Sequence, residues 1–278
     1  MFQLRCGSYL LSLDRPLIMG IVNLTPDSFS GDGVVGDIDQ ALRHAREQLD
    51  AGSDILDIGA ESSRPGAIPT PEDEELRRLI PILREITTWG VPVSVDTYKP
   101  AVMRAALAAG ASMINDIAGL SRPGALEAVA DSNCGLCVMH MQGEPGTMQQ
   151  APCYNDVLGE VEDFLSAVVA RCRGAGIADD RLVVDPGFGF GKTLAHNLEL
   201  FRDLGRVSVD GLPLLIGVSR KSMLGTITGR PVEHRQAASI AAALIAAQKG
   251  ARILRVHDVA ATRDALAVWS AIEIGSVQ

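Results

Sequence analysis

The residues of this sequence best suited to chemistry are polar side chains that directly follow short apolar runs. Carboxylates and amides at such positions can bind the polar edge of a small molecule, and basic side chains can bind an anion. Their recurrence along the chain predicts one site assembled from many segments. These residues are Asn23, Glu61, Asp96, Asn115, His140, Asp185, Ser219 with Arg220 and Lys221, and His257.

The segment 185–192, DPGFGFGK, combines a carboxylate with three glycines and two phenyl rings. It is not a Walker phosphate loop, because that motif needs glycine six residues before its lysine and the position is occupied by Pro186. The dinucleotide fingerprint GxGxxG fails too, since the glycines stand at 187, 189 and 191. The pattern instead suits a flat heteroaromatic molecule, whose N–H groups would donate to Asp185.

Arg255 and His257 lie two residues apart in a strand-like run, so their side chains share one face. Both can donate to a phosphate or sulfate, the arginine through a bidentate fork. The stretch 219–222, SRKS, adds positive charge, and together these residues predict an anion site that a diphosphate would fit. The alternative is a salt bridge from Arg255 or His257 to Asp258 or to a neighbouring carboxylate.

Two patterns raise the question of a bound transition metal. Asp96, Asn115 and Asp185 could point into one pocket, but no His or Glu stands near them at ligand spacing. Cys134 and Cys137 have the CxxC spacing, yet no second pair follows and they begin an apolar run. We therefore favour inert, buried thiols and no dedicated transition-metal site.

Eight apolar runs rich in Val, Ile and Leu alternate with helix-like stretches along the chain. Such strands are typical of a parallel sheet that is buried on both faces. Eight units in 278 residues predict an α/β fold, a single (β/α)8 TIM barrel whose active site lies at the C-terminal ends of its strands. The predicted strands are 16–22, 54–59, 91–95, 112–114, 135–139, 182–184, 213–218 and 252–256.

We expect a single domain over 1–278, in which a β-hairpin at 1–14 closes the bottom of a barrel formed by 15–278. The first helix is predicted to be capped by Asp37, and the second to have Thr70 as N-cap and Pro71 as its first residue. Pro81 should bend or break the second helix. The later helices are predicted at 100–109, 124–132, 156–174, 195–204, 232–248 and 259–273.

The composition is that of a globular protein, with 47% hydrophobic and 21% charged residues and a net charge of −9. This acidic net charge argues against a protein that binds nucleic acid or anionic membranes in general, because such a protein would need a basic face. No apolar run approaches the roughly 20 residues needed to cross a bilayer. We expect a cytoplasmic protein with small-molecule partners.

Taken in order, these motifs resemble those of the bacterial dihydropteroate synthase family, a pterin-binding TIM-barrel family. The resemblance covers essentially the whole chain, and the motifs fall at the ends of the predicted strands. They are NLTPDSFS at 23–30, ESSRPG at 61–66, SVDT at 94–97, ND at 115–116, MHMQ at 139–142, DPGFGFGK at 185–192, SRKS at 219–222 and RVHD at 255–258.

The resemblance implies that 6-hydroxymethyl-7,8-dihydropterin diphosphate condenses with 4-aminobenzoate to give 7,8-dihydropteroate for folate synthesis, with Mg²⁺ as cofactor. It assigns the pterin to Asp96, Asn115, Asp185 and Lys221, with Met139, Phe190 and Arg220 lining the slot. It assigns the diphosphate to Asn23, Ser63, Arg255 and His257, with Asn23 acting through Mg²⁺. It assigns the 4-aminobenzoate to Phe29, Arg64, Pro65 and Ser222. Asp96, Asp185, Lys221, Arg255 and His257 are the implied catalytic residues.

Two departures from the family pattern stand out. Many members have Thr where this chain has Ser63, which retains the hydroxyl group. After Ser30 the chain has Gly-Asp-Gly where the common pattern is Asp-Gly-Gly, which shifts the acid of this loop to Asp32.

Two alternatives to the synthase are a pterin-dependent methyltransferase of the same superfamily and a non-catalytic pterin-binding paralogue. A methyltransferase has no need of Arg255, His257 or the motif at 23–30, and a drifted paralogue would be expected to have lost loop or charged residues. The presence of all these residues favours the synthase.

Three further expectations concern loops, inhibition and assembly. The loops 23–36 and 60–70 are expected to cover the substrates. Sulfonamides are expected to compete with 4-aminobenzoate. The helix at 232–248 is apolar on nearly all sides, and it is expected to form a homodimer interface with the last helix.

Overall fold

A closed barrel of parallel strands is the framework of the protein in a computed structural model, which describes residues 3–24, 34–64, 66–207 and 209–273. Within these ranges, the strands β3 to β10 pair in the order β10-β3-β4-β5-β6-β7-β8-β9, and each strand runs parallel to its neighbours. The predicted (β/α)8 barrel is confirmed. Its strands are β3 (Leu17–Asn23), β4 (Ile55–Gly59), β5 (Val93–Asp96), β6 (Met113–Asp116), β7 (Gly135–Met139), β8 (Leu182–Asp185), β9 (Leu214–Ile216) and β10 (Ala251–Val256).

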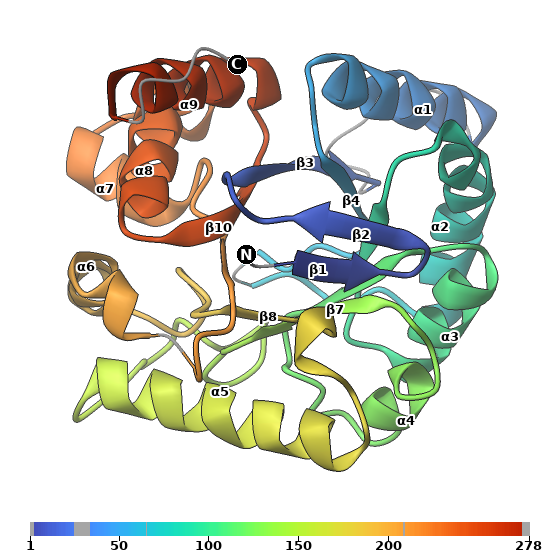
Figure 1. The fold of residues 1–278 in the computed structure, drawn as a ribbon, viewed down its shortest axis with the longest axis horizontal. Helices are drawn as coiled ribbons and strands as arrows, with labels where there is room; N and C mark the ends of the chain where they lie inside the picture. Colours follow the sequence, from blue (N-terminus) through green and yellow to red (C-terminus); the bar gives the residue numbers. More distant parts are fainter. Residues whose placement is uncertain (1–2, 25–33, 65, 208, 274–278) are drawn as a thin grey trace.

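Helices surround the barrel, as Figure 1 shows. Their apolar faces pack on the outward side chains of the strands and form with them a large hydrophobic cluster. The helices are α1 (Val34–Asp50), α2 (Glu72–Ile86), α3 (Pro100–Ala108), α4 (Ala125–Val129), α5 (Val157–Gly174), α6 (Leu194–Arg202), α7 (Ser222–Thr228), α8 (Gln236–Gln248) and α9 (Val259–Glu273).

Several helix ends differ from the sequence-based prediction. Helix α1 begins at Val34, so Asp37 lies inside its first turns and is not the cap. Helix α2 begins at Glu72 with Pro71 at the N-cap, whose side chain has no polar atom to form a cap bond, so the predicted cap at Thr70 is wrong. The backbone amide of Thr70 donates to Glu61 and its carbonyl accepts from Lys99. The helix continues through Pro81 without a break. Helix α7 was not predicted; its seven residues are too short to show a helical period.

The N-terminal hairpin β1 (Gln3–Cys6) and β2 (Tyr9–Ser12) lies across one end of the barrel (Figure 1). The amide of Gly7 donates to the carbonyl of Asn133, just before β7, and a Cβ on Gly135 would lie 2.7 Å from Cys6 Sγ. The hairpin therefore covers the N-terminal ends of the strands. This confirms the predicted plug.

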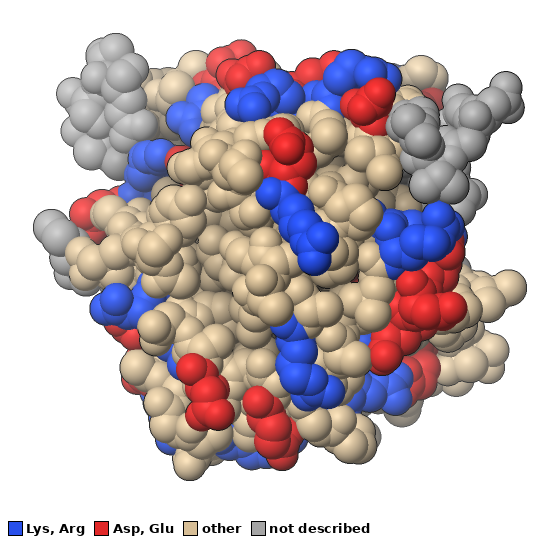
Figure 2. Space-filling model, turned by 90° about the vertical axis from the view of Figure 1, so that its right-hand side faces the viewer, with Lys and Arg blue, Asp and Glu red and all other residues tan. Residues whose placement is uncertain are grey.

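The surface carries both signs of charge. On the face drawn in Figure 2, Lys and Arg side chains are interspersed with Asp and Glu. None of the described helices has the length and hydropathy needed to cross a membrane.

The hairpin also completes the lower core inside the barrel. Leu4 and Leu13 are fully buried against the interior side chains Met19, Ile55 and Val183. This second cluster is separate from the outer one, because the strands lie between them.

Leu4→Ala is expected to lower the free energy of unfolding by about 2–5 kcal/mol, because it leaves a cavity in this lower core. Leu10→Ala in the same hairpin is the matched control. Its side chain is 50% exposed, so its loss should change stability by about 0.5 kcal/mol or less. Urea denaturation of both variants measures the difference, and equal losses would show that the hairpin does not seal the barrel.

Candidate active site

Alternate residues of each strand point into the barrel, and the chemistry of this interior changes along its axis. The lower interior is apolar, as at Ile55, Met113 and Val183. Two residues further along the same strands come Asp57, Asn115 and Asp185, all buried. Polar side chains therefore line the upper interior of the barrel, beneath the C-terminal ends of the strands, and we call this part of the interior the chamber.

Arg255 on β10 is the main cation of this chamber. Its Nε donates to Asp57 Oδ2 at 2.6 Å and its Nη2 donates to Asp96 Oδ2 at 2.8 Å. Burial lowers the pKa of Arg255, but Asp57 and Asp96 together raise it above its ordinary value. Burial raises the pKa of Asp96 to about 7, although the positive charge of Arg255 opposes this shift. The salt bridge of Arg255 to neighbouring carboxylates is therefore present, and Asp258 is not its partner.

Sequence reasoning missed Asp57. This residue on β4 is fully buried, and its Oδ2 accepts hydrogen bonds from Arg255 and, at 3.4 Å, from Asn115 Nδ2. Its Oδ1 has no hydrogen-bond partner among the described residues. A signal was present in the sequence, because an acid in the middle of the apolar run ILDIG is costly unless it is paired.

Asp185, at the end of β8, and Lys221, after β9, supply further charges of the chamber. Asp185 Oδ1 accepts from the amide of Gly187 at 2.7 Å. Burial raises the pKa of Asp185, and Lys221 opposes this shift. Lys221 Nζ donates to the carbonyl of Phe188 at 2.5 Å and lies 4.7 Å from the ring centroid of Phe190. Met139 is buried at the end of β7, next to Asp185 in the sheet register.

The glycine-rich turn after Asp185 is held in place by the side chain of Lys192, through hydrogen bonds to its backbone carbonyls. Its buried Nζ lies 2.8 Å from His140 Nδ1 and donates to the carbonyls of Gly187 and Phe190 at 3.0 and 3.1 Å. Gly187 has φ +70°, and a Cβ there would lie 1.9 Å from the carbonyl oxygen of His140. The turn therefore requires glycine at 187, where the backbone passes against β7. Sequence reasoning gave Lys192 no role.

The remaining basic residues have other partners. Arg220 donates to Asp258 at 2.8 and 3.3 Å. Asp258 is therefore the ion-pair partner of Arg220 and not of Arg255 or His257. His257 Nδ1 lies 3.0 Å from Ser219 Oγ. Burial first, and then the charges of Arg220 and Arg255, lower the pKa of His257 to about 3, so its imidazole is neutral at pH 7.

The other predicted site residues lie around the rim. Ser63 is half-buried and Arg64 is exposed in the loop after β4, and Ser222 is exposed at the first position of α7. Arg64 also contributes to lowering the pKa of His257, so its charge acts on that side of the mouth. Phe29 and Pro65 lie outside the described residues, as does most of the predicted loop 23–36, with Asp32.

The residues present fit Mg²⁺ only as part of a substrate-bound site. Asn23 is half-buried at the end of β3, and its Oδ1 would lie 3.9 Å from a Cβ placed on Gly59. Within the part of the chain that the structure describes, no three His, Cys, Asp or Glu side chains gather as a metal site. Magnesium commonly keeps several waters and takes few protein ligands together with phosphate oxygens. Asn23 suits that role.

The CxxC cysteines are buried and free. Burial raises the pKa of both the Cys134 and the Cys137 thiol. A high thiol pKa disfavours the reactive thiolate. These findings agree with the inert interpretation.

Comparison with known proteins now identifies the family. The model of a family described as pterin binding enzyme matches residues 19–257 of this chain. The chain belongs to the pterin-binding enzyme family. The dihydropteroate synthase of Neisseria meningitidis serogroup C is 52% identical over 275 residues, which cover 97% of both proteins.

Two crystal structures of dihydropteroate synthases are similar to this pterin-binding enzyme over nearly the full length. One, from Burkholderia cenocepacia, is complexed with 7,8-dihydropteroate; it is 52% identical, has a TM-score of 0.91, and the alignment covers 99% of this chain and 97% of that chain. The other, from Xanthomonas albilineans, contains 4-aminobenzoic acid; it is 51% identical with a TM-score of 0.92, and the alignment covers 98% of both chains. The family resemblance drawn from the motifs is confirmed.

The buried Lys192 of this pterin-binding enzyme predicts a pH dependence of stability. Burial lowers the pKa of Lys192 from 10.5 to about 7. The unfolded chain then binds a proton that the folded protein lacks between these values, so stability rises with pH in this window. The cost of the buried charge is fully present below about pH 7, and about 2 kcal/mol of it should be relieved between pH 7 and 9.

Lys192→Met removes this titration, so the variant should gain less stability than the unsubstituted protein between pH 7 and 9. Urea denaturation at both pH values measures the gain. Lys249→Met is the control, since Lys249 Nζ donates to the carbonyl of Arg202 outside the barrel mouth. An identical pH dependence in the Lys192 variant and the unsubstituted protein would contradict the prediction.

Proposed function

We propose that this pterin-binding enzyme is a dihydropteroate synthase, which condenses 6-hydroxymethyl-7,8-dihydropterin diphosphate with 4-aminobenzoate to give 7,8-dihydropteroate and diphosphate in folate biosynthesis. The observation that carries the proposal is the convergence of acidic, amide and basic groups in one barrel mouth. They lie in a chain about half identical to named dihydropteroate synthases over nearly its full length. The converging residues are Asp96, Asn115, Asp185, Lys221 and Arg255.

The buried carboxylates suit the pterin. Asp185 and Asp96 are acceptors when ionised, and the N–H groups of a pterin ring are donors. Asn115 supplies both functions, and Lys221 adds donors above the ring of Phe190. Met139 and Arg220 would complete the walls of this slot.

The diphosphate would bind on the Arg255 side. Asp57 and Asp96 use the Nε and one Nη2 donor of the guanidinium, so part of its five-donor fork is left for the anion. His257, Ser63 and Asn23 would contribute further donors or hold Mg²⁺. Bound Mg²⁺ would neutralise part of the negative charge of the leaving diphosphate.

The aminobenzoate would enter last, between the pterin and the rim. We assign it to Phe29, Arg64, Pro65 and Ser222. Its amine is a weak nucleophile, so loss of diphosphate should lead the reaction. The carbon–oxygen bond to diphosphate then breaks, the amine nitrogen bonds to the pterin methylene, and the amine releases a proton. Asp96 and Asp185 would favour the cationic methylene.

Both alternative functions have weaker support. The relatives with about half of their residues identical are named dihydropteroate synthases, whereas a methyltransferase has no need of Arg255 and His257 together. A non-catalytic paralogue would be expected to have lost charged site residues, and those described remain in the mouth.

Homodimerisation and a cytoplasmic location also remain proposals. Large apolar side chains are exposed on neighbouring helices, namely Ile227 on α7, Ile245 on α8 and Val268 and Ile272 on α9. Such side chains suit a subunit contact. Ala243, also on α8, is only 2% exposed and packs within the chain. A charged substitution at Ala243 would therefore disturb the fold of the subunit as well as any dimer contact.

The activity is tested by diphosphate release from the pterin substrate with Mg²⁺, with and without 4-aminobenzoate. We expect release together with dihydropteroate formation when both substrates are present. A sulfonamide should inhibit competitively with 4-aminobenzoate, because it reproduces the aniline ring. No dihydropteroate under these conditions would overturn the proposal, and noncompetitive inhibition would show that the aminobenzoate subsite is misplaced.

Asp185→Asn should weaken pterin binding by about 10- to 100-fold, because it replaces an acceptor-only group with an amide that also presents donors. Calorimetry with the free pterin measures this loss. Asp180→Asn is the control, because Asp180 is on the surface and pairs with Arg5. Pterin affinity within twofold of the unsubstituted protein would remove Asp185 from the pterin site.

A further inference from the structure

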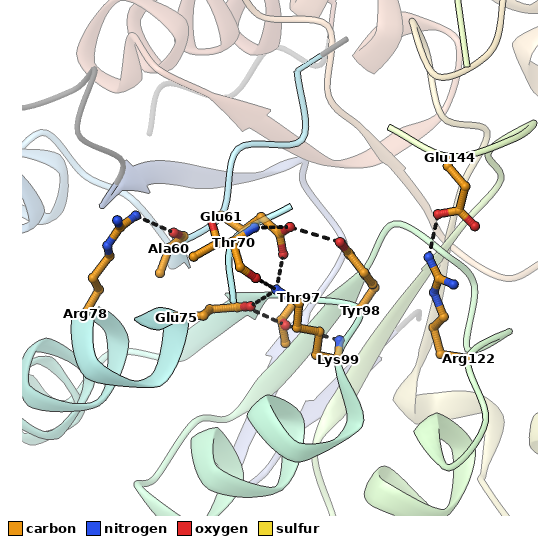
Figure 3. Close-up of polar contacts among 10 residues, drawn as sticks. All are labelled: Ala60, Glu61, Thr70, Glu75, Arg78, Thr97, Tyr98, Lys99, Arg122 and Glu144. Carbon is orange, nitrogen blue, oxygen red and sulfur yellow. Dashed lines mark hydrogen bonds and ion pairs between the residues drawn. The ribbon is translucent and has the colours of Figure 1, made fainter. Parts of the chain in front are cut away.

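A buried cluster of charges lies beside the barrel mouth, outside the residues assigned so far. Lys99 Nζ, just before α3, donates to Glu61 Oε2 and to Glu75 Oε2, both at 2.6 Å. Glu61 follows β4 and Glu75 is in the first turn of α2, so the ammonium joins three segments of the chain (Figure 3).

The cluster binds both ends of the loop 61–70. Glu61, at the start of the loop, accepts through Oε1 from the amide of Thr70 at 3.0 Å and from the Tyr98 hydroxyl at 2.9 Å. Lys99 Nζ donates to the carbonyl of Thr70 at 2.5 Å. The two ends of the loop are therefore held to each other and to the same lysine, as in a compact Ω-loop.

Burial makes this arrangement costly to disturb. The side chain of Glu75 is fully buried, and those of Glu61 and Lys99 are 8% and 16% exposed. Lys99 uses its three donors on Glu61, Glu75 and Thr70, and Glu75 Oε1 accepts from the Thr97 hydroxyl at 2.7 Å. A buried ion-pair cluster contributes little net stability compared with an apolar core, and specifying a conformation is a better-attested role.

The middle of the loop is fixed at a second point. The amide of Gly66 donates to the carbonyl of Pro145 at 3.2 Å, on the segment after β7. The neighbouring Glu144 pairs with Arg122, whose guanidinium lies 5.3 Å from the ring centroid of Tyr98 (Figure 3). The loop tip is therefore connected through Glu144 and Arg122 to Tyr98, which directly precedes Lys99 in the sequence.

The loop held in this way carries site residues. Ser63, Arg64 and Pro65 lie within 61–70, and the charge of Arg64 helps to lower the pKa of His257. Lys99 also lies three residues after Asp96, the carboxylate that holds Arg255. The cluster thus joins the segment after the pterin-side strand β5 to the loop that reaches the rim.

We propose that Lys99 is a positioning residue for the aminobenzoate subsite. By joining Glu61, Thr70 and Glu75, it holds the loop 61–70 in the conformation that presents Arg64 to the amine substrate. The inference rests on the proposed function. It predicts that loss of the cluster impairs use of 4-aminobenzoate while the pterin slot stays intact, because Asn115, Asp185 and Lys221 make none of these contacts.

Lys99→Met and Glu61→Gln test the proposal by steady-state kinetics and pterin calorimetry. The KM for 4-aminobenzoate should rise by about tenfold or more in both variants, since a small misplacement of a binding group is costly. The Kd for the free pterin should stay within twofold. Lys249→Met, outside the barrel mouth, should change neither quantity.

Glu61→Gln keeps the experiment decisive if Lys99→Met fails to fold, because it leaves Glu75 paired with Lys99. Equal losses of pterin and aminobenzoate binding would indicate a general structural role and overturn the proposal. So would an unchanged KM in a folded variant.

Hydrogen exchange of the amides of Gly66 and Thr70 provides a readout independent of activity. Exchange there should accelerate in both variants and stay unchanged in Lys249→Met. Accelerated exchange with an unchanged KM would show that the cluster anchors the loop without serving the substrate, which overturns the assignment. Absence of dihydropteroate formation by the unsubstituted protein would instead overturn the proposed function, and this assignment with it.

Discussion

Closure of the parallel strands into a barrel is the constraint on which the remaining structure depends. Closure sends alternate side chains of every strand into one interior and brings all C-terminal strand ends to one mouth. Asp57, Asp96, Asn115 and Arg255 come from positions up to 198 residues apart in the chain, yet two hydrogen bonds from Arg255 join three of the strands. An apolar lower interior, sealed by the N-terminal hairpin, supports this chamber from below.

The chamber gathers charge at a place where charge is expensive. Three carboxylates and two basic groups lie within it, and burial shifts the pKa values of Asp96 and Asp185 upward and that of Lys221 downward, to about 8. Each shift is opposed by a partner of opposite sign. Substrate groups that pair with these residues would replace water in a largely desolvated site, where fixed charges act most strongly.

Backbone geometry around the mouth is controlled by lysines that do not belong to the assigned substrate subsites. Lys192 binds the glycine-rich turn through its carbonyls, and Lys99 binds the loop 61–70 through Thr70 and two glutamates. Both side chains donate to segments that lack regular secondary structure, and Lys99 also pairs with Glu75 in the first turn of α2. Such segments have few backbone partners of their own, so side chains must supply them.

The sequence by itself determined the strand order, the barrel and most of the residues at the mouth. Unbroken apolar strands followed by polar residues indicate this architecture, because parallel strands must be buried on both faces and share one active edge. It could not show that Arg255 pairs with Asp57 and Asp96, that Thr70 is bound by Lys99 and does not cap α2, or that Lys192 supports the turn after Asp185. These are contacts between segments distant in the chain. Only the tertiary structure decides them, because the partner of a buried charge depends on which strand ends and loops the closed barrel brings together.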